Sequence, residues 1–198
     1  MSLLVETIKI HNGCFVNADV HQRRMNHARK VLYGAHEPFN LIGFLDDLQI
    51  PNEGLFKCRL IYDHKILDIH INPYEVRKIE VLKLVCHDNI AYPFKMLDRL
   101  LLDELFQQKG IADEILVVKH GMITDAYYYN VVFQKDNLYF TPANPLLKGV
   151  QREVLLKNRE ISTKEIKDKD IYKYDFIHLI NAMTSLHEIK ISTSQIIK

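Results

Sequence analysis

A single lysine stands among apolar and turn-forming neighbours in the segment YPFKMLDRL, which runs from residue 92 to residue 100. Lysine side chains are almost always exposed, so the simplest interpretation of Lys95 is a solvated residue in the first turn of a helix. A lysine shielded from water loses its proton more readily, and its neutral amine is then a nucleophile that forms Schiff bases with carbonyl compounds. The segment leaves both interpretations open.

Three later motifs contain polar residues that could support such chemistry. The run TDAYYYN supplies Asp125 and Asn130, LLKGVQRE places Gly149 just before a predicted helix, and NAMTSLHEI contains Asn181. Each residue also has an ordinary structural interpretation, since Asp, Asn and Gly are common in turns, at strand ends and before helices. The order of the motifs along the chain is what favours a shared function.

That order resembles the class IV aminotransferases, the fold type IV pyridoxal-phosphate enzymes, over nearly the whole chain and most densely from Lys95 to Ile191. The family includes branched-chain and D-amino-acid aminotransferases and 4-amino-4-deoxychorismate lyase. The resemblance implies an α+β, two-domain, D-amino-acid-aminotransferase-like fold, with a small N-terminal α/β sandwich and a larger C-terminal mixed pseudobarrel domain. It also implies pyridoxal 5′-phosphate as the cofactor and Lys95 as the catalytic lysine, which binds the cofactor covalently and then moves the substrate α-proton.

The resemblance assigns further residues to the cofactor. The family places a Thr-Glu pair five residues before an Asn, and here Asp125 replaces the Glu ahead of Asn130, which shortens the reach by one methylene. Asp125 is expected to keep the pyridine nitrogen protonated. The helix that begins near Gly149, Val150 and Gln151 is expected to bind the phosphate through its backbone N–H groups.

Two arginines of the first half also match positions in the family. HQRRM supplies His21 and Arg24 at the spacing of the family's His-x-x-Arg, which implies that Arg24 binds the cofactor phosphate while Arg23 faces elsewhere on the helix. Arg59, in FKCRLIY, matches an arginine that binds a substrate carboxylate in some relatives. A solvated surface arginine is the alternative interpretation of both Arg24 and Arg59.

The last motif, NAMTSLHEI, resembles the Asn-Ala-Leu of the lyase branch more than the Gly-Thr-Ala of the aminotransferases. It implies that Asn181 lies at the active site, in contact with cofactor and substrate. Ala182 stands where aminotransferases have a phosphate-binding threonine, and Thr184 and Ser185 are possible substitutes for it.

These motifs favour a lyase-like reaction that eliminates pyruvate from 4-amino-4-deoxychorismate. KMLDRL also resembles the lyase branch, although Asp98 replaces an Asn. An amino-acid aminotransferase of the branched-chain or D-amino-acid type is the alternative. A non-catalytic relative that binds pyridoxal phosphate is a third possibility, because part of the family's first domain is missing between Gly34 and Lys57.

Composition narrows the class of partner. The chain has 198 residues, a formal net charge of +1 and no long apolar run, which argues against nucleic acid and membrane as partners. Its three cysteines, Cys14, Cys58 and Cys86, have no metal-binding spacing and are expected to be reduced thiols of a cytoplasmic protein. We expect a small-molecule substrate with an amino group, no metal, and a homodimer as in the family.

The first half of the chain predicts a small α+β domain over residues 1–86. Asn12-Gly13 between two alternating runs predicts a hairpin, and residues 17–34 predict a helix that ends at Gly34. A short helix over residues 39–51 follows, and strands are expected within residues 54–74 and 77–86. The polar segment 87–94 is predicted to be a linker.

The remaining residues, 95–198, are predicted to form the cofactor-binding domain. A helix is expected over residues 96–110, then strands that turn at His120-Gly121 and Asp136-Asn137. A helix over 149–161 and two strands within 175–192 complete the pattern. The charged run KEIKDKDIYKYD is expected to be a solvated face or loop.

Overall fold

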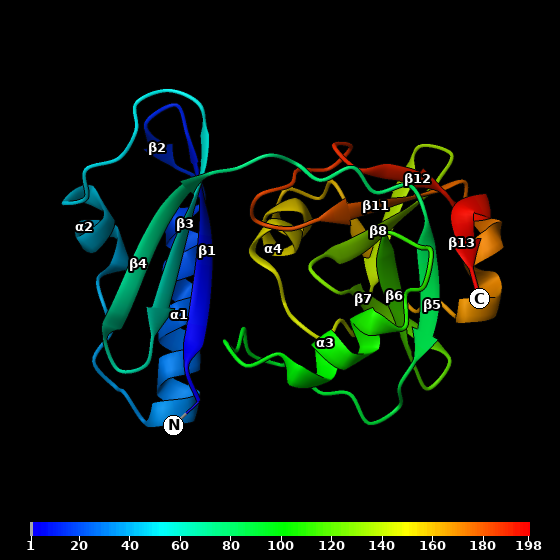
Figure 1. Ribbon diagram of the computed structural model, residues 1–198, viewed down its shortest axis with the longest axis horizontal. Helices are drawn as coiled ribbons and strands as arrows, with labels where there is room; N and C mark the ends of the chain where they lie inside the picture. The colour runs from blue at the N-terminus through cyan, green and yellow to red at the C-terminus, as the bar shows by residue number, and fades with distance from the viewer. Residues whose placement is uncertain (1) are drawn as a thin grey trace. The chain divides into compact units, whose positions relative to one another are not determined.

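The computed structural model describes residues 2–198, and its contacts divide the chain into two compact units (Figure 1). Unit 1 comprises the chain up to Val76 together with Phe94–Asp98, and unit 2 comprises Arg77–Pro93 and Arg99–Lys198. This division differs from the predicted boundary after residue 86, because strand β5 (Leu82–Cys86) pairs with a strand of unit 2. The predicted linker likewise contains Ile90 and Tyr92, which are buried.

Unit 1 is a four-stranded antiparallel sheet in the order β2-β1-β3-β4, covered on one face by two helices (Figure 1). Its elements are β1 (Leu4–His11), β2 (Cys14–Phe15), α1 (Ala18–Tyr33), α2 (Leu41–Asp46), β3 (Leu55–Tyr62) and β4 (Ile66–Pro73). Met25 of α1 and Leu45 of α2 pack against Ile8 and Leu60 of the sheet. Burial of these apolar side chains supplies the main driving force for unit 1 to fold.

The local signals of unit 1 are confirmed. Asn12 and Gly13 both have positive φ, of 47° and 75°, and the strands on either side of them pair as a hairpin. Helix α1 ends at Gly34, whose φ of 66° allows its N–H to bond to the carbonyls of Arg29 and Lys30.

Unit 2 contains a nine-stranded mixed sheet in which seven strands follow the order β10-β9-β8-β7-β6-β5-β13, while β11 pairs with β8 and β12. Its elements besides β5 are α3 (Leu100–Gln107), β6 (Glu114–Lys119), β7 (Met122–Ala126), β8 (Asn130–Lys135), β9 (Leu138–Pro142), α4 (Val150–Lys157), β10 (Ser162–Lys164), η1 (Asp168–Lys173), β11 (Phe176–Ile180), β12 (Lys190–Ser192), η2 (Thr193–Gln195) and β13 (Ile196–Ile197). Two sheets with few helices confirm the predicted α+β class.

The sheet of unit 2 divides along one edge of β8. The other edge of β8 pairs with β11 from Asn130 to Gln134, so β7 and β9 must share the remaining edge. Strand β9 pairs with the last residues of β8, from Phe133 to Lys135, and β7 pairs with β8 only through Asp125 and Asn130. Asp125 and Asn130, both predicted to bind the cofactor, therefore lie at the point where the sheet separates.

Two expectations for unit 2 need correction. The helix predicted from residue 96 begins only at Leu100, because the backbones of Lys95 and Leu97 bond to those of Val5 and Leu3 instead. The charged run 164–175 exposes most of its charges, as predicted, but it also forms η1 and buries Ile166 and Ile171 in the core. A few apolar side chains within a polar run were enough to anchor it.

Candidate active site

Asp125, near the end of β7, is a buried carboxylate whose two oxygens are both held by neutral donors. Its Oδ1 accepts a hydrogen bond from Nδ2 of Asn130 at 2.7 Å, and its Oδ2 accepts one from the backbone N–H of Leu147 at 2.9 Å. Only 5% of the residue is exposed. The carboxylate is therefore fixed in position, and among residues 2–198 it forms no salt bridge.

Burial raises the pKa of Asp125 to about 6. The hydrogen bonds from Leu147, Asn130 and Leu146 oppose that shift, and so does the nearby positive charge of Arg152. Desolvation wins because neutral donors stabilise an anion less than a paired cation would. A cation placed against this carboxylate would lower its pKa again.

Asn130, at the start of β8, joins this carboxylate to the loop before α4. Besides Asp125, its Nδ2 donates to the carbonyl of Leu147 at 2.8 Å. Its Oδ1 lies against the backbone at Gly149, where an added Cβ would come within 2.0 Å of it. Glycine is therefore required at position 149 for a steric reason, because its φ of −75° is open to any residue.

Helix α4 begins directly after Gly149. Glu153 closes the first turn by donating its N–H to the carbonyl of Gly149, and Gly149 has no side chain to cap the helix. The N–H groups of the first turn, including those of Val150 and Gln151, have no acceptor within the helix. These groups and the positive end of the helix dipole favour an anion at this position.

Asn181 follows β11 and lies beside this group, since Ile180 pairs with Asn130. Its side chain organises the turn after the strand: Oδ1 accepts from the N–H groups of Met183 and Thr184, and Nδ2 donates to the carbonyl of Tyr128. Ala182, at the tip of this turn, is half-buried.

The hydroxyl of Thr184 is buried without a hydrogen-bond partner among residues 2–198. A buried hydroxyl without a partner is uncommon and costly. This hydroxyl therefore stays a candidate for the missing threonine of the family.

In unit 1, Arg24 does not have an open guanidinium. Its Nε and Nη2 donate to the two carboxylate oxygens of Glu6 at 2.9 and 2.5 Å. His21, one helical turn earlier, contacts the same carboxylate through Nδ1 at 2.6 Å. The His-x-x-Arg spacing thus brings two side chains onto one buried acid, and a second bidentate contact of Arg24 would have to use its Nη1–Nη2 edge.

Glu6 has a pKa of about 2 although burial alone would raise it, because Arg24 and His21 supply opposing charge and hydrogen bonds. The pKa of His21 is lowered by burial, against the effect of Glu6. A neutral His21 that donates from Nδ1 leaves Nε2 as an acceptor, and this nitrogen is buried without a partner among the described residues. Glu6 has no predicted role in the sequence analysis, because a single acid in an alternating strand does not reveal which side chains from other elements will contact it.

Lys95 also belongs to unit 1. Its carbonyl accepts from the N–H of Val5 at 2.9 Å, and Leu4 and Met96 form an antiparallel bridge beside it. The lysine is half-buried, and its positive charge contributes to the lowered pKa of His21. Lys95 is therefore part of an extended segment along β1 and not of a helical first turn.

Arg59 lies in β3 opposite Thr7 and His70. Its neighbours Cys58 and Leu60 face the core, so alternation places Arg59 on the sheet face away from the helices, where it is half-buried. Its role in binding a substrate stays a prediction.

The predicted residues thus fall into two groups. Unit 2 brings together Asp125, Asn130, Gly149 and Asn181, whereas Arg24 and Lys95 lie in unit 1. No group of three or more metal-ligating side chains occurs in residues 2–198, and no helix in that range is long and apolar enough to cross a membrane.

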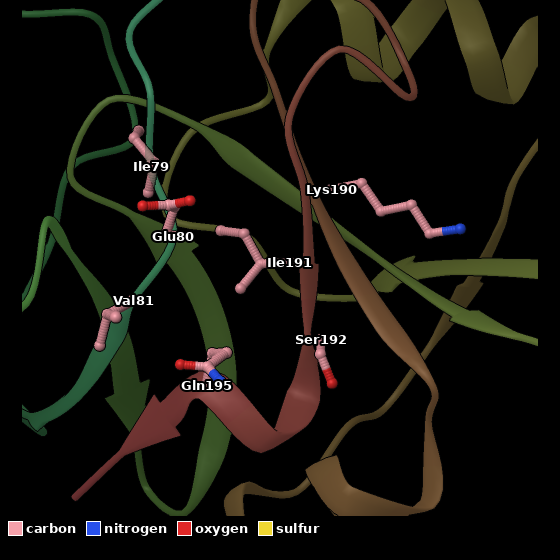
Figure 2. Close-up of a pocket in the computed structure, with 7 residues that line it drawn as sticks. All are labelled: Ile79, Glu80, Val81, Lys190, Ile191, Ser192 and Gln195. Atoms are coloured by element: carbon pink, nitrogen blue, oxygen red, sulfur yellow. The ribbon is translucent and has the colours of Figure 1, made fainter.

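A hollow of about 480 Å³ in unit 2 contains none of these residues (Figure 2). It is lined by Ile79, Glu80, Val81, Lys190, Ile191, Ser192 and Gln195. Figure 2 shows the Lys190 amine pointing away from the Glu80 carboxylate, so the polar groups do not converge on a common point. We assign this hollow no function.

Known proteins identify the class. The model of the family described as amino-transferase class IV matches residues 88–191. An uncharacterized protein of Haemophilus influenzae is 36% identical over 186 residues, which cover 92% of this chain and 98% of that protein. The chain belongs to the class IV aminotransferase family and is an enzyme, as its motifs predicted.

Solved structures agree with this fold. A candidate 4-amino-4-deoxychorismate lyase from Haemophilus somnus 129PT is 35% identical with a TM-score of 0.88, over 94% of this chain and 98% of that one. A candidate amino-acid aminotransferase from Mesorhizobium loti is 23% identical with a TM-score of 0.82, over 97% and 99%. The Escherichia coli branched-chain amino acid aminotransferase is 14% identical with a TM-score of 0.75, over 96% and 76%. The last two likenesses show the fold alone.

Proposed function

We propose that this enzyme binds pyridoxal 5′-phosphate through Lys95 and catalyses a lyase-like elimination of pyruvate from 4-amino-4-deoxychorismate. The observation that carries the cofactor assignment is the state of Asp125. It is a buried carboxylate that is held by neutral donors, and burial has raised its pKa to about 6. A protonated pyridine nitrogen is the kind of cation that would neutralise it.

The residues around Asp125 fit the two ends of that cofactor. Asp125 would hold a proton on the ring nitrogen, while Asn130 and the Leu147 N–H keep the carboxylate from rotating. The first turn of α4, from Gly149 to Gln151, would bind the phosphate through backbone N–H groups. When bound, the cofactor supplies the electron sink for carbanion chemistry at the substrate.

Besides the first turn of α4, the phosphate would take contacts from two further places. One is Arg24, whose side chain is held in place because Glu6 accepts from its Nε and Nη2. The turn at Asn181 and Ala182 is the other. Ala182 has no hydroxyl, which leaves the buried Thr184 hydroxyl as a candidate donor.

Lys95 would act as the base and acid of the reaction. Its half-buried amine, beside the buried His21, is expected to remove the α-proton of the substrate and to return a proton later. Arg59 remains our candidate for a substrate carboxylate. The homodimer stays a prediction from the family, and the cytoplasmic location stays a prediction from the cysteine pattern.

Support for a lyase-like reaction comes from two sources. KMLDRL and NAM resemble the lyase branch, and the relative from Haemophilus somnus, at 35% identity, is a candidate lyase. An amino-acid aminotransferase is the second candidate, because the family has both activities and no described residue excludes it. A relative that binds the cofactor without turnover is the third.

Two experiments separate these candidates. Borohydride treatment of the protein mixed with pyridoxal phosphate should leave a stable adduct that peptide mapping places on Lys95. An adduct on another lysine, or none, would remove the basis of the proposal.

Single-turnover spectra with 4-amino-4-deoxychorismate should then show pyruvate without any added 2-oxo acid. Glutamate and branched-chain amino acids serve as controls. A cofactor that converts to its amine form with one of these, and reverts with a 2-oxo acid, would instead identify an aminotransferase.

A further inference from the structure

Tyr127 lies in the loop that joins β7 to β8, two residues after Asp125, and three charged side chains hold it. Its N–H donates to Oε1 of Glu114 at 3.2 Å, and its carbonyl accepts from Nη2 of Arg99 at 2.5 Å. Its phenol donates to Oδ1 of Asp103. We call Glu114, Arg99 and Asp103 the Tyr127 clamp.

The clamp combines two separate parts of unit 2, the start of α3 and the start of β6. Arg99 is the N-cap residue of α3, Asp103 lies in the first turn of α3, and Glu114 is the first residue of β6. The Tyr127 ring stacks on Phe106 of α3 with centroids 4.3 Å apart. The Arg99 guanidinium lies 4.5 Å from the centroid of the Tyr127 ring. Every polar and aromatic part of Tyr127 therefore has a partner.

Such an arrangement is costly for a loop. Glu114 is fully buried, and its Oε2 has no hydrogen-bond partner in the described chain; the same is true of Arg99 Nε. Burying charged groups with unsatisfied atoms lowers stability. The neighbouring hairpins turn instead at His120-Gly121 and at Asp136, with positive φ and no buried charges.

The loop held by the clamp carries the candidate active site. Asp125 and Asn130 are its two ends, and a hydrogen bond from Ala126 N–H to the Tyr129 carbonyl closes it. The Tyr128 carbonyl accepts from Nδ2 of Asn181. Movement of the loop would therefore disturb the contact between Asp125 and Asn130 and the turn at Asn181.

We propose that the Tyr127 clamp is a positioning device that fixes Asp125, Asn130 and Asn181 for the reaction. The inference rests on the proposed function for what these three residues do, but not for the existence of the clamp. Arg99 lies four residues after Lys95, so one short segment carries both the proposed catalytic lysine and a residue of the clamp. The clamp residues are positioning residues and need not touch substrate.

The test compares three variants with the unaltered protein. Arg99→Gln removes the guanidinium from the Tyr127 carbonyl, and Asp103→Leu removes the acceptor for the phenol. Asp103→Asn keeps an acceptor oxygen and is the conservative control. Arg159→Gln, at an exposed arginine outside the clamp, is the control for loss of positive charge.

Amide hydrogen exchange of the cofactor-free protein is the first measurement. In Arg99→Gln and Asp103→Leu, residues 126–130 should exchange at least about tenfold faster while the strands of unit 1 keep their protection. Both control variants should behave like the unaltered protein. Unchanged exchange of residues 126–130 in both disruptive variants would overturn the clamp, whether or not the protein binds pyridoxal phosphate.

The protein loaded with pyridoxal phosphate gives the second measurement. In Arg99→Gln and Asp103→Leu, the pH at which the cofactor absorbance titrates should shift, and kcat should fall at least about tenfold, because small misplacements of reacting groups cost large factors in rate. Asp103→Asn should restore both values. Faster exchange with an unchanged titration and kcat would show a merely structural role and reject the proposal.

Discussion

Glu6 of unit 1 and Asp125 of unit 2 are both buried carboxylates, yet their surroundings differ in one respect. Glu6 accepts from the cationic Arg24 and from His21, and its pKa falls to about 2. Asp125 accepts from an amide and from backbone N–H groups, and burial raises its pKa to about 6. Hydrogen bonds alone therefore did not offset the loss of solvation, whereas hydrogen bonds with a counter-charge did.

The difference suggests different roles for the two acids. A carboxylate that already has its cation is a structural group, and removing it leaves buried positive charge behind. A carboxylate held in place without a cation is prepared to receive one. We therefore expect Glu6 to matter mainly for stability and Asp125 mainly for chemistry.

The largest expected effect is that of Asp125→Asn on turnover. A neutral amide cannot hold the proton on the cofactor ring, so kcat should fall at least about a hundredfold, as when an electrostatic group of an active site is lost. Stability should change by only about 1 kcal/mol, because one hydrogen bond is lost while a desolvated charge disappears. Steady-state kinetics and urea unfolding measure the two effects, and full activity in this variant would break the comparison.

Glu6→Gln should show the opposite balance. Arg24 and His21 lose their anion in a buried site, and the free energy of unfolding should fall by about 3 kcal/mol or more. Urea unfolding of the cofactor-free protein measures this loss. Glu53→Gln, at an exposed glutamate of the same unit, is the matched control and should be neutral. Equal stability of the two variants would mean that Glu6 is not a structural ion-pair partner.

Substitution of Arg24 should lower both cofactor affinity and stability, whereas substitution of Arg23 should lower neither. Loss of a charge-assisted hydrogen bond to phosphate costs about 1.5–3 kcal/mol, so Arg24→Ala should weaken cofactor binding about tenfold to a hundredfold. The same substitution should also destabilise unit 1, because it leaves the buried Glu6 carboxylate without its arginine. Arg23 forms an exposed pair with Asp19, and Arg23→Ala should change both quantities little. Cofactor titration by fluorescence and urea unfolding would compare the variants, and equal losses would show the His-x-x-Arg assignment to be wrong.

The last effect is a pH dependence of stability with opposite signs in the two units. The folded pKa of Glu6, about 2, lies below its usual value of 4.5, so its stabilisation is complete above pH 4.5 and is lost as the pH falls toward 2. The folded pKa of Asp125 is raised from 3.8 to about 6, so the folded state binds this proton more tightly. Its contribution is therefore lost as the pH rises from about 4 to 6.

The measurement is the free energy of unfolding of the cofactor-free protein from pH 3 to pH 8. Asp125→Asn should remove the decline between pH 4 and 6, and Glu6→Gln should remove the decline below pH 4.5. Glu114, whose pKa burial raises to about 7, adds a decline up to that pH, which Glu114→Gln should remove. Identical profiles for all four proteins would contradict the assigned environments.

Much of the local structure was predictable because its causes are local. Asn12-Gly13 and Gly34 have positive φ, which few other residues tolerate, and their turns lie where the sequence indicated. The helix start near residue 96 was not predictable, because a backbone pairing between Lys95 and Val5 competes with it. Strand β13 was missed for the same reason, since its partner Leu82 lies far away in the sequence.

By itself, the sequence determined the family, the order of the motifs and the residue types available for chemistry. It also supplied Asp125 and Asn130 at a spacing that one hairpin loop can bridge, whereas the need for glycine at position 149 comes from its tertiary contact with Asn130. Only the tertiary structure decided which of the buried acids has a cation. Arg24 reaches Glu6 from a helix that packs on its strand, whereas Asp125 receives only neutral donors, from Asn130 of β8 and from the loop before α4. A pKa depends on what the whole fold brings within a few ångströms of a group, and that information is not contained in any single motif.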